Sequence, residues 1–234
     1  MTPTSVSISM IESKDAAADV LATYRATRAR MSALQDDLLK QIPRKEGLRI
    51  ASETGVPRGA TPTADDEALA TVLLDFAIYQ PREGGLSIVH RRARLRTAKL
   101  PENDPERIVL EAMARSGFSL FKIVELRPGL GALMRDVISD RTSLMIDVNL
   151  SKSLATDVVL ATRMIDHGPF WTTTGASMVA SDRLQEATER VIVKIREVGA
   201  GPDALLDPEC QRLIQSFALA EYLNRQTGTV VRYL

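Results

Sequence analysis

The spacing of apolar residues predicts a long helix near the start of the chain. Ser13 is a suitable N-cap, and apolar or near-apolar residues then recur every three or four positions until Pro43 ends the helix. This seam is narrow because two of its members, Thr27 and Gln41, are polar. It favours one arm of an antiparallel helix pair within the subunit, and the alternative is a dimerisation helix at residues 17–41. The seam consists of Ala17, Val20, Tyr24, Thr27, Met31, Leu34, Leu38 and Gln41.

Three more helices are predicted before residue 118, after a Gly- and Pro-rich linker at residues 55–62. The first begins at Thr63 and has the core stripe Leu69, Val72, Leu73 and Phe76. Asp75 falls at the edge of this stripe, where it is either a rim residue paired with an arginine or a catalytic carboxylate. Residues 87–100 repeat Ile88, Arg92, Leu95 and Lys99 as a helix would, with a strand at 86–96 as the alternative. The third helix starts at the Asp104–Pro105 cap, ends at Gly117, and turns Ile108, Val109 and Met113 to a core, with Ala112 as a further candidate.

From Phe118 the pattern changes to short strands separated by turn residues. The strands are predicted at residues 118–126, 133–138, 144–148, 158–165 and 170–174. Connections this short cannot make a parallel sheet, which needs long crossovers. We therefore expect a small antiparallel sheet or, if it curls and closes, an SH3-like or OB-like barrel.

The last third of the chain returns to helix. Ser181 or Asp182 caps one helix, which ends at Gly199, and Asp207–Pro208 starts a second. Residues 229–234 are predicted to form a short strand at a sheet edge. The two apolar faces expected are Leu184, Ala187, Val191, Ile195 and Val198, and then Cys210, Leu213, Ile214, Phe217 and Ala220.

These elements define an α+β fold in which N- and C-terminal helices flank a small antiparallel β module. Four segments follow from the pattern: an N-terminal helical segment at 1–54, a helical segment at 63–117, the β module at 118–180, and a C-terminal helical segment at 181–234.

Composition narrows the class of protein. The 234 residues carry 30 basic and 30 acidic side chains, so bulk charge does not indicate a polyanion partner and excludes a histone-like protein. One cysteine excludes an intramolecular disulfide and cysteine-based zinc sites. No apolar run reaches membrane-spanning length, and the first residues lack a signal-peptide layout. A cytoplasmic protein that does not enter the membrane is expected.

Catalytic patterns are sparse. His90, His167 and Cys210 lie outside any nucleophile motif, and Gly129–Gly131 lacks the third glycine of a phosphate-binding loop. Asp136, Asp140 and Asp147 are candidate ligands for a metal-dependent hydrolase, although turns collect aspartates for structural reasons. Without a positioned acid–base pair, the sequence favours a protein that is not an enzyme and has no cofactor.

The central block resembles a bacterial family of uncharacterised proteins, some of which carry a cysteine-rich SEC-C zinc motif. The resemblance covers about residues 65–180 and implies the α+β layout without an activity. A single Cys210 cannot supply the zinc motif. The residues that carry the resemblance are Leu74-Asp-Phe-Ala-Ile-Tyr79, Ser119-Leu-Phe-Lys-Ile-Val-Glu125, Gly131 with Arg135-Asp-Val137, Leu150-Ser-Lys-Ser153, Leu160-Ala-Thr-Arg163 and Phe170-Trp171.

A local run of cations is the main functional indication: Arg91, Arg92, Arg94, Arg96 and Lys99. Such a run can neutralise several phosphates, and bases could stack on exposed aromatics among Phe118, Phe121, Phe170 and Trp171. The alternative is a solvated helix face balanced by the acids at 65–67 and 102–106. The sequence therefore predicts a non-catalytic binding or adaptor protein that contacts nucleic acid through this basic segment. The alternatives are a protein-interaction module that dimerises through the first helix, and a hydrolase using the β-module carboxylates.

Overall fold

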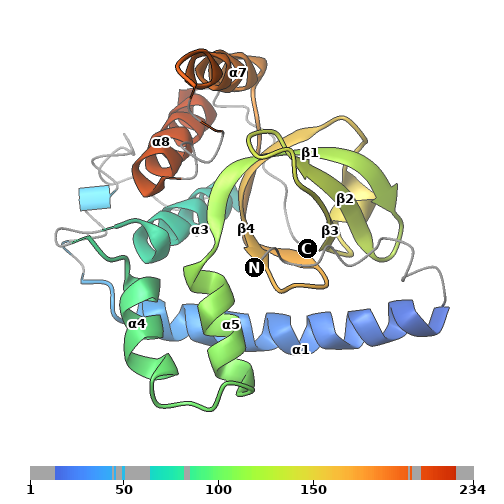
Figure 1. Ribbon diagram of the computed structural model, residues 1–234, viewed down its shortest axis with the longest axis vertical. Helices are drawn as coiled ribbons and strands as arrows, with labels where there is room; N and C mark the ends of the chain where they lie inside the picture. Colours follow the sequence, from blue (N-terminus) through green and yellow to red (C-terminus); the bar gives the residue numbers. More distant parts are fainter. Residues whose placement is uncertain are drawn as a thin grey trace.

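The computed structural model describes residues 14–43, 45, 49–50, 64–81, 85–199, 201 and 207–224. Over these residues the chain forms seven helices and a five-stranded closed barrel, which confirms the α+β prediction (Figure 1). The predicted linker at 55–62, the cap at Thr63 and the strand at 229–234 lie outside the described residues.

The helices and strands follow the predicted order closely. Residues 88–97 are helical, so the strand alternative for this segment is wrong. Strand β5 is longer than predicted, and a short helix, α6, falls in the loop expected between β3 and β4. The elements are α1 (Lys14–Leu39), α3 (Ala64–Tyr79), α4 (Ile88–Thr97), α5 (Pro105–Ala114), β1 (Gly117–Arg127), β2 (Gly131–Asp136), β3 (Thr142–Ile146), α6 (Leu150–Ser153), β4 (Val159–Asp166), β5 (Trp171–Val179), α7 (Asp182–Glu197) and α8 (Pro208–Asn224).

The barrel has the strand order β1-β2-β3-β5-β4, and β4 returns to β1. Neighbouring strands are antiparallel, as expected, except that β3 and β5 run parallel where Met145 meets Trp171. Helix α6 lies between β3 and β4 and adds Leu150 to the core inside the barrel. Of the two barrel types expected, this Greek-key order is that of the OB-like one.

Side chains fill the barrel, so it encloses a core and no channel. The inward residues alternate along each strand, as the pleat requires. At one end Phe121 meets Trp171 edge to face, with 5.7 Å between ring centroids. The buried members of this core are Phe121, Ile123, Ala132, Met134, Met145, Leu150, Leu160, Met164 and Trp171.

Helix α1 packs along the outside of the barrel (Figure 1). Its N-terminal half, with Val20, Leu21 and Tyr24, covers β3 and the loops that precede β2 and β5. Arg28 donates to the Thr173 carbonyl at 2.8 Å, and Gln35 donates to that of Thr174 at 3.3 Å. In OB folds, strands β2 and β3 with these same two loops hold oligonucleotides. In this chain, α1 occupies much of that surface.

The apolar seam of α1 is therefore in contact with its own chain. Met31, Leu34 and Leu38 are buried in a cluster that also contains residues of α4, α5 and β4. The partner of the seam is mainly the barrel and α5, rather than one antiparallel helix. A dimer using residues 17–41 would have to form on the outward side of α1 or replace these contacts, and self-association stays a prediction.

Helices α7 and α8 lie away from α1 on the barrel, and α3 lies between them and α1, packing on both (Figure 1). The predicted apolar face of α8 lies between the barrel and α7. Ile214 and Phe217 pack against the cluster that contains Phe118 of the barrel, and with Leu213 they also line an apolar groove of about 320 Å³ beside α7. Ala218, Leu219 and Gln215 face inward. Gln215 is fully buried, and its side-chain amide is satisfied there because it accepts a hydrogen bond from Arg163 and donates one to Asp75.

Two short helices bury only part of the stripe predicted for them, namely Ile88 on α4, and Val109 and Met113 on α5. Helix α4 turns Val89 and Ala93 to the core, while Leu95 is 69% exposed. Helix α5 buries Val109, Leu110, Ala112 and Met113 but leaves Ile108 48% exposed. The predicted α4 stripe contained Arg92 and Lys99, and burying unpaired cations would cost more than exposing one leucine.

Among the helices that the structure describes, none combines the length and apolar character required to cross a membrane.

Candidate functional site

The basic segment forms helix α4 because its first turn is capped. The Ser87 hydroxyl accepts a hydrogen bond from the His90 amide at 3.3 Å and lies 2.7 Å from His90 Nδ1. A serine beside a histidine is also the arrangement of a nucleophile and its base. Ser87 is completely buried, however, and its oxygen serves as the cap. This pair therefore holds the start of α4 and offers no reactive hydroxyl to a substrate.

Most cations of α4, counting Lys99 just after its end, form no ion pair with the side chains that the structure describes. Arg96 donates to Glu106 at 2.8 Å, and this bond raises the pKa of Arg96. The other four basic side chains, Arg91, Arg92, Arg94 and Lys99, form no ion pair with any side chain that the structure describes. Of the acids at 102–106 that were expected to neutralise the basic segment, only Glu106 forms an ion pair with it. The side chains at 65–67, the other acids expected to do so, lie outside the described part of the chain.

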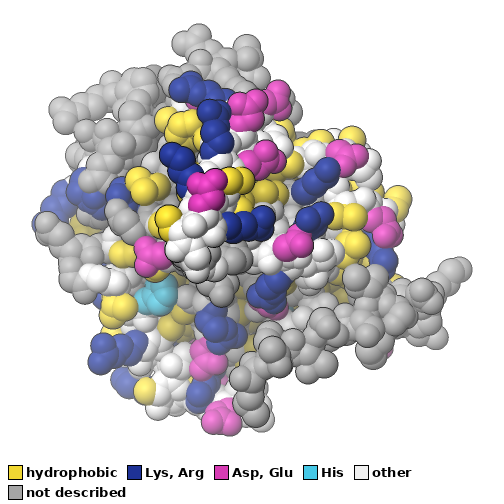
Figure 2. Space-filling view, turned by 45° about the horizontal axis from the view of Figure 1, so that its top comes forward, with side chains coloured by type: hydrophobic (Ala, Val, Ile, Leu, Met, Phe, Trp, Pro, Cys, Tyr) yellow, Lys and Arg dark blue, Asp and Glu magenta, His cyan; other side chains and the backbone are white. Residues whose placement is uncertain are grey.

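Arg91, Arg92 and Lys99, together with the paired Arg96, border a groove of about 600 Å³ that also touches Gln41. Arg94 is not part of its lining. Elsewhere, basic and acidic side chains are intermixed over the visible face, as expected for a chain of zero net charge (Figure 2). The unpaired α4 cations are therefore a local basic surface on an otherwise balanced molecule.

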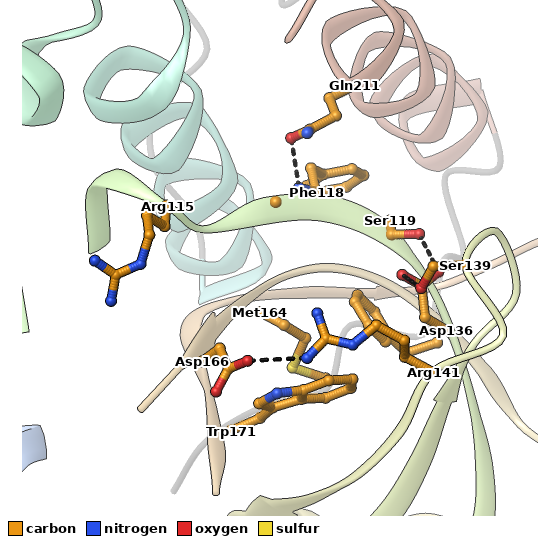
Figure 3. Close-up of a pocket in the computed structure, with 12 residues that line it drawn as sticks. Arg115, Phe118, Ser119, Asp136, Ser139, Arg141, Met164, Asp166, Trp171 and Gln211 are labelled. Carbon is orange, nitrogen blue, oxygen red and sulfur yellow. Dashed lines mark hydrogen bonds and ion pairs between the residues drawn. The ribbon is translucent and has the colours of Figure 1, made fainter. Parts of the chain in front are cut away.

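A second candidate lies at the mouth of the barrel, where the strand ends meet. The cavity there has a volume of about 380 Å³ and opens between α5, α8 and the β2–β3 turn (Figure 3). Phe121, Met164 and Trp171 form its floor. The polar wall and rim consist of Arg115, Ser119, Asp136, Ser139, Arg141, Asp166 and Gln211.

Arg141 covers the aromatic floor. Its guanidinium carbon lies 5.7 Å from the centre of the Trp171 ring, and its Nη2 donates to Asp166 at 3.1 Å. Arg115 lies on the other side of the opening, and its side chain is 69% exposed with one long contact of 3.9 Å to Glu111 (Figure 3). Two guanidinium groups therefore border one cavity from different elements.

Asp136 organises the wall of this cavity. One carboxylate oxygen accepts from Ser119 Oγ at 2.7 Å and from the Ile138 amide at 2.9 Å, and the other accepts from Ser139 Oγ at 2.8 Å. Three donors on a buried carboxylate fix the turn between β2 and β3.

The three aspartates proposed as metal ligands do not come together. Asp140 pairs with Arg135 in the turn, and Asp147 accepts from the Asn149 and Leu150 amides at the start of α6. Burial raises the pKa of the Asp147 carboxyl. Within the described residues, no three histidine, cysteine, aspartate or glutamate side chains are arranged to hold a metal ion.

The four aromatic residues considered for base stacking are all buried. Phe118, Phe121 and Phe170 are at most 3% exposed, and Trp171 is 5% exposed beneath Arg141. They form the cores inside and outside the barrel, so none provides an open stacking surface.

A pocket of about 380 Å³ connects the barrel mouth with α4. It shares Arg115 and Gln211 with the mouth and reaches His90 on α4. Burial lowers the pKa of His90, and the nearby Arg163 charge lowers it further. Arg163 borders this pocket and pairs with Asp75 at 3.1 Å; their side chains are 4% and 1% exposed. Asp75 therefore has the arginine partner expected for it, but at a buried position and not at a rim.

Sequence reasoning did not single out Arg115, Arg141 or Gln211. Each is an ordinary polar residue in a turn or on a helix, and only the closure of the barrel brings them together. The lone tryptophan after a Gly-Pro turn was the one available indication of this end of the barrel.

The β4–β5 turn carries a titratable group that should make stability depend on pH. His167 Nε2 lies 3.0 Å from Thr172 Oγ1, and burial lowers the pKa of His167 to about 4 despite the nearby Asp166 carboxylate. Between pH 6.5 and 4 the unfolded chain thus binds a proton that the folded chain does not, and stability falls as pH falls. From pH 7 to pH 5 we expect His167 to account for a loss of about 1–2 kcal/mol in the free energy of unfolding. Urea titrations of wild type and His167→Gln at both pH values measure it, and parallel losses in the two proteins would contradict it.

The comparisons place the chain in a family without an assigned role. A family model described as "Family of unknown function (DUF7986)" matches residues 18–229, so the chain belongs to this family. No curated protein and no solved structure shows significant similarity to it. Membership in an uncharacterised family is confirmed, whereas the bacterial origin and the link to a SEC-C motif stay predictions.

Proposed function

We propose that this protein binds nucleic acid without catalysis, and that the unpaired cations of α4 neutralise phosphates of the bound strand. The observation that carries the proposal is the set Arg91, Arg92, Arg94 and Lys99, which form no ion pair with a described side chain. Arg91, Arg92 and Lys99 also border an open groove. Exposed unpaired cations repel one another, and a polyanion relieves this repulsion while releasing condensed counterions. The groove of about 600 Å³ gives phosphates room to approach from solvent.

The arrangement favours contact with the backbone over recognition of bases. The β-module aromatics are buried, and α1 covers the barrel face that reads oligonucleotides in OB folds. Lys and Arg contacts to phosphate position a nucleic acid but carry no sequence information. Binding should therefore be nearly independent of sequence and strongly dependent on salt.

The test is an anisotropy titration with labelled single-stranded RNA and duplex DNA at about 50 and 200 mM salt. Four phosphate contacts predict a loss of affinity of about 50-fold to 150-fold over this range. Arg91→Glu with Arg94→Glu should weaken binding at least about tenfold at 50 mM salt.

The matched control is Lys194→Glu with Arg196→Glu on α7. Both side chains are exposed, the change in net charge is the same, and α7 lies across the molecule from α4 (Figure 1). The control variant should bind like wild type. No binding at 50 mM salt, or equal losses in the two variants, would refute the proposal.

A further inference from the structure

The connecting pocket beside α4 and the cavity at the barrel mouth form one bent path. Starting on α4, His90 borders the connecting pocket, with Arg91 next to it in sequence and Arg94 one helical turn further along α4. That pocket and the mouth share Arg115 and Gln211, and Arg141 lies over the floor of the mouth. Cationic or imidazole side chains therefore recur along the whole path, from a convex helix into a concave end.

The path ends blind. The core inside the barrel, with Phe121 and Trp171 uppermost, closes the floor of the mouth, and α6 adds to this core from the loop between β3 and β4. A chain that enters the mouth must therefore stop there or turn back. Each pocket measures about 380 Å³, which is at the small end of the range for ligand cavities.

We infer that the nucleic acid bound on α4 is single-stranded and that its chain continues past Arg115 into the barrel mouth, where a nucleotide contacts Arg141 above Trp171. This inference rests on the proposed function and specifies the form of nucleic acid. A duplex is stiff over about 50 nm and reaches only surfaces that protrude, such as α4. A single strand bends at each nucleotide and can follow the path.

The mouth offers such a nucleotide two kinds of contact. The guanidinium groups of Arg115 and Arg141 donate to phosphate oxygens with forked geometry. Bases also stack on guanidinium planes, and the Arg141 side chain is 57% exposed above the tryptophan. Asp166, which pairs with Arg141, leaves a second side of that guanidinium open to the cavity.

Trp171 makes this inference directly measurable, because it is the only tryptophan in the chain. Intrinsic fluorescence therefore reports one position, the floor of the mouth. Titration with an unlabelled 20-nucleotide single strand, as RNA and as DNA, should change the Trp171 emission with the same midpoint as the anisotropy. A 20-base-pair duplex should change the anisotropy and leave the emission unaltered.

The mouth variant is Arg115→Glu with Arg141→Glu, and Arg115→Glu alone serves if the double variant does not fold. Either should weaken single-strand binding about tenfold at 50 mM salt and change duplex binding less than twofold. Lys194→Glu with Arg196→Glu is again the control for net charge.

The outcomes separate this inference from the proposed function. Anisotropy that depends on the α4 cations, with constant Trp171 emission or an unaffected mouth variant, would overturn the single-strand path and leave α4 binding intact. Equal emission changes with duplex and single strand would also overturn it. Absence of any anisotropy change at 50 mM salt would refute both.

Discussion

Arg163→Met is expected to lower the free energy of unfolding by about 3–5 kcal/mol, because it leaves the buried Asp75 carboxylate without its counter-charge. The Arg163 guanidinium lies under α3 and α8, donates to Asp75 at 3.1 Å, and stacks 4.5 Å from the centre of the Tyr79 ring. Removing it takes away the charge partner and a packed surface together. Urea unfolding followed by circular dichroism measures the loss.

The neighbours of this pair explain why the loss should be large. Gln215 donates to Asp75 at 2.9 Å and accepts from Gln80 at 2.7 Å and from Arg163 at 3.3 Å. One carboxylate oxygen of Asp75 is already buried without a hydrogen-bond partner among the described residues. Without Arg163, the unpaired Asp75 carboxylate cannot reach water unless α3 or α8 separates from the barrel.

Two controls distinguish charge from packing. Asp75→Leu combined with Arg163→Met replaces both charges with apolar groups and should recover at least half of the loss. Arg115→Met removes an arginine that is exposed, and should change stability by less than about 0.5 kcal/mol. If Arg163→Met alone costs less than about 1 kcal/mol, the pair does not stabilise the fold in the way argued here.

The sequence predicted the elements well where a local rule determines them. The predicted caps at Asp104 and Ser181 each accept the backbone hydrogen bond expected of an N-cap, because a cap depends only on the next three residues. The five strands were likewise evident from alternation and turns. The order of the strands in the barrel depends on contacts between distant residues. The sequence therefore left the SH3-like and OB-like orders as alternatives.

The inward faces of α4 and α8 were harder to predict. Apolar periodicity pointed to Leu95 on α4 and to Leu213 on α8, and both are exposed. On α8 the inward face contains Gln211 and Gln215, which bond to the Phe118 amide and to the Asp75–Arg163 pair. A glutamine side chain can hydrogen-bond equally to water or to buried polar groups. Whether it faces solvent or the core therefore depends on its partners elsewhere in the fold and not on the helix that carries it.

For the candidate site, too, residues adjacent in sequence were predictable and residues brought together by the fold were not. The cations of α4 are adjacent in sequence and were therefore found together. Arg115 and Arg141 come from the α5–β1 and β2–β3 connections, and Trp171 begins β5, so only the completed barrel places them around one mouth. The three aspartates illustrate the reverse error: nearness in sequence suggested a cluster, but each one caps a turn or pairs with a different partner.

Gly131→Ala is expected to destabilise the protein by about 3 kcal/mol or more, because the new methyl group would occupy space already filled by backbone. A Cβ at Gly131 would lie 2.0 Å from the Met145 carbonyl oxygen and 2.9 Å from the Asp147 amide nitrogen. Neither atom can turn aside as a side chain could, so β2 and β3 would have to separate at this point. A glycine inside a strand often marks such a close approach of two backbones.

The separation would spread because both atoms belong to connected structures. The Asp147 amide donates to the Leu130 carbonyl at 3.1 Å, and the Asp147 carboxylate caps α6, which adds Leu150 to the barrel core. Met145 also forms the parallel pair with Trp171 that closes the barrel. Moving this one strand junction therefore disturbs both the closure and the end of the barrel.

Thermal unfolding of Gly131→Ala should show a midpoint lower by about 6 °C or more, at about 2–4 °C per kcal/mol for a chain of this size. Gly117→Ala is the matched control, since it is also a strand glycine and the atoms nearest to its added Cβ belong to the Gln211 side chain, at an ordinary contact distance of 3.5 Å. The control should melt within about 2 °C of wild type. If the two variants melt together, β2 and β3 do not approach as closely at Gly131 as the barrel geometry requires, and the register of Gly131 with Ile146 would be wrong.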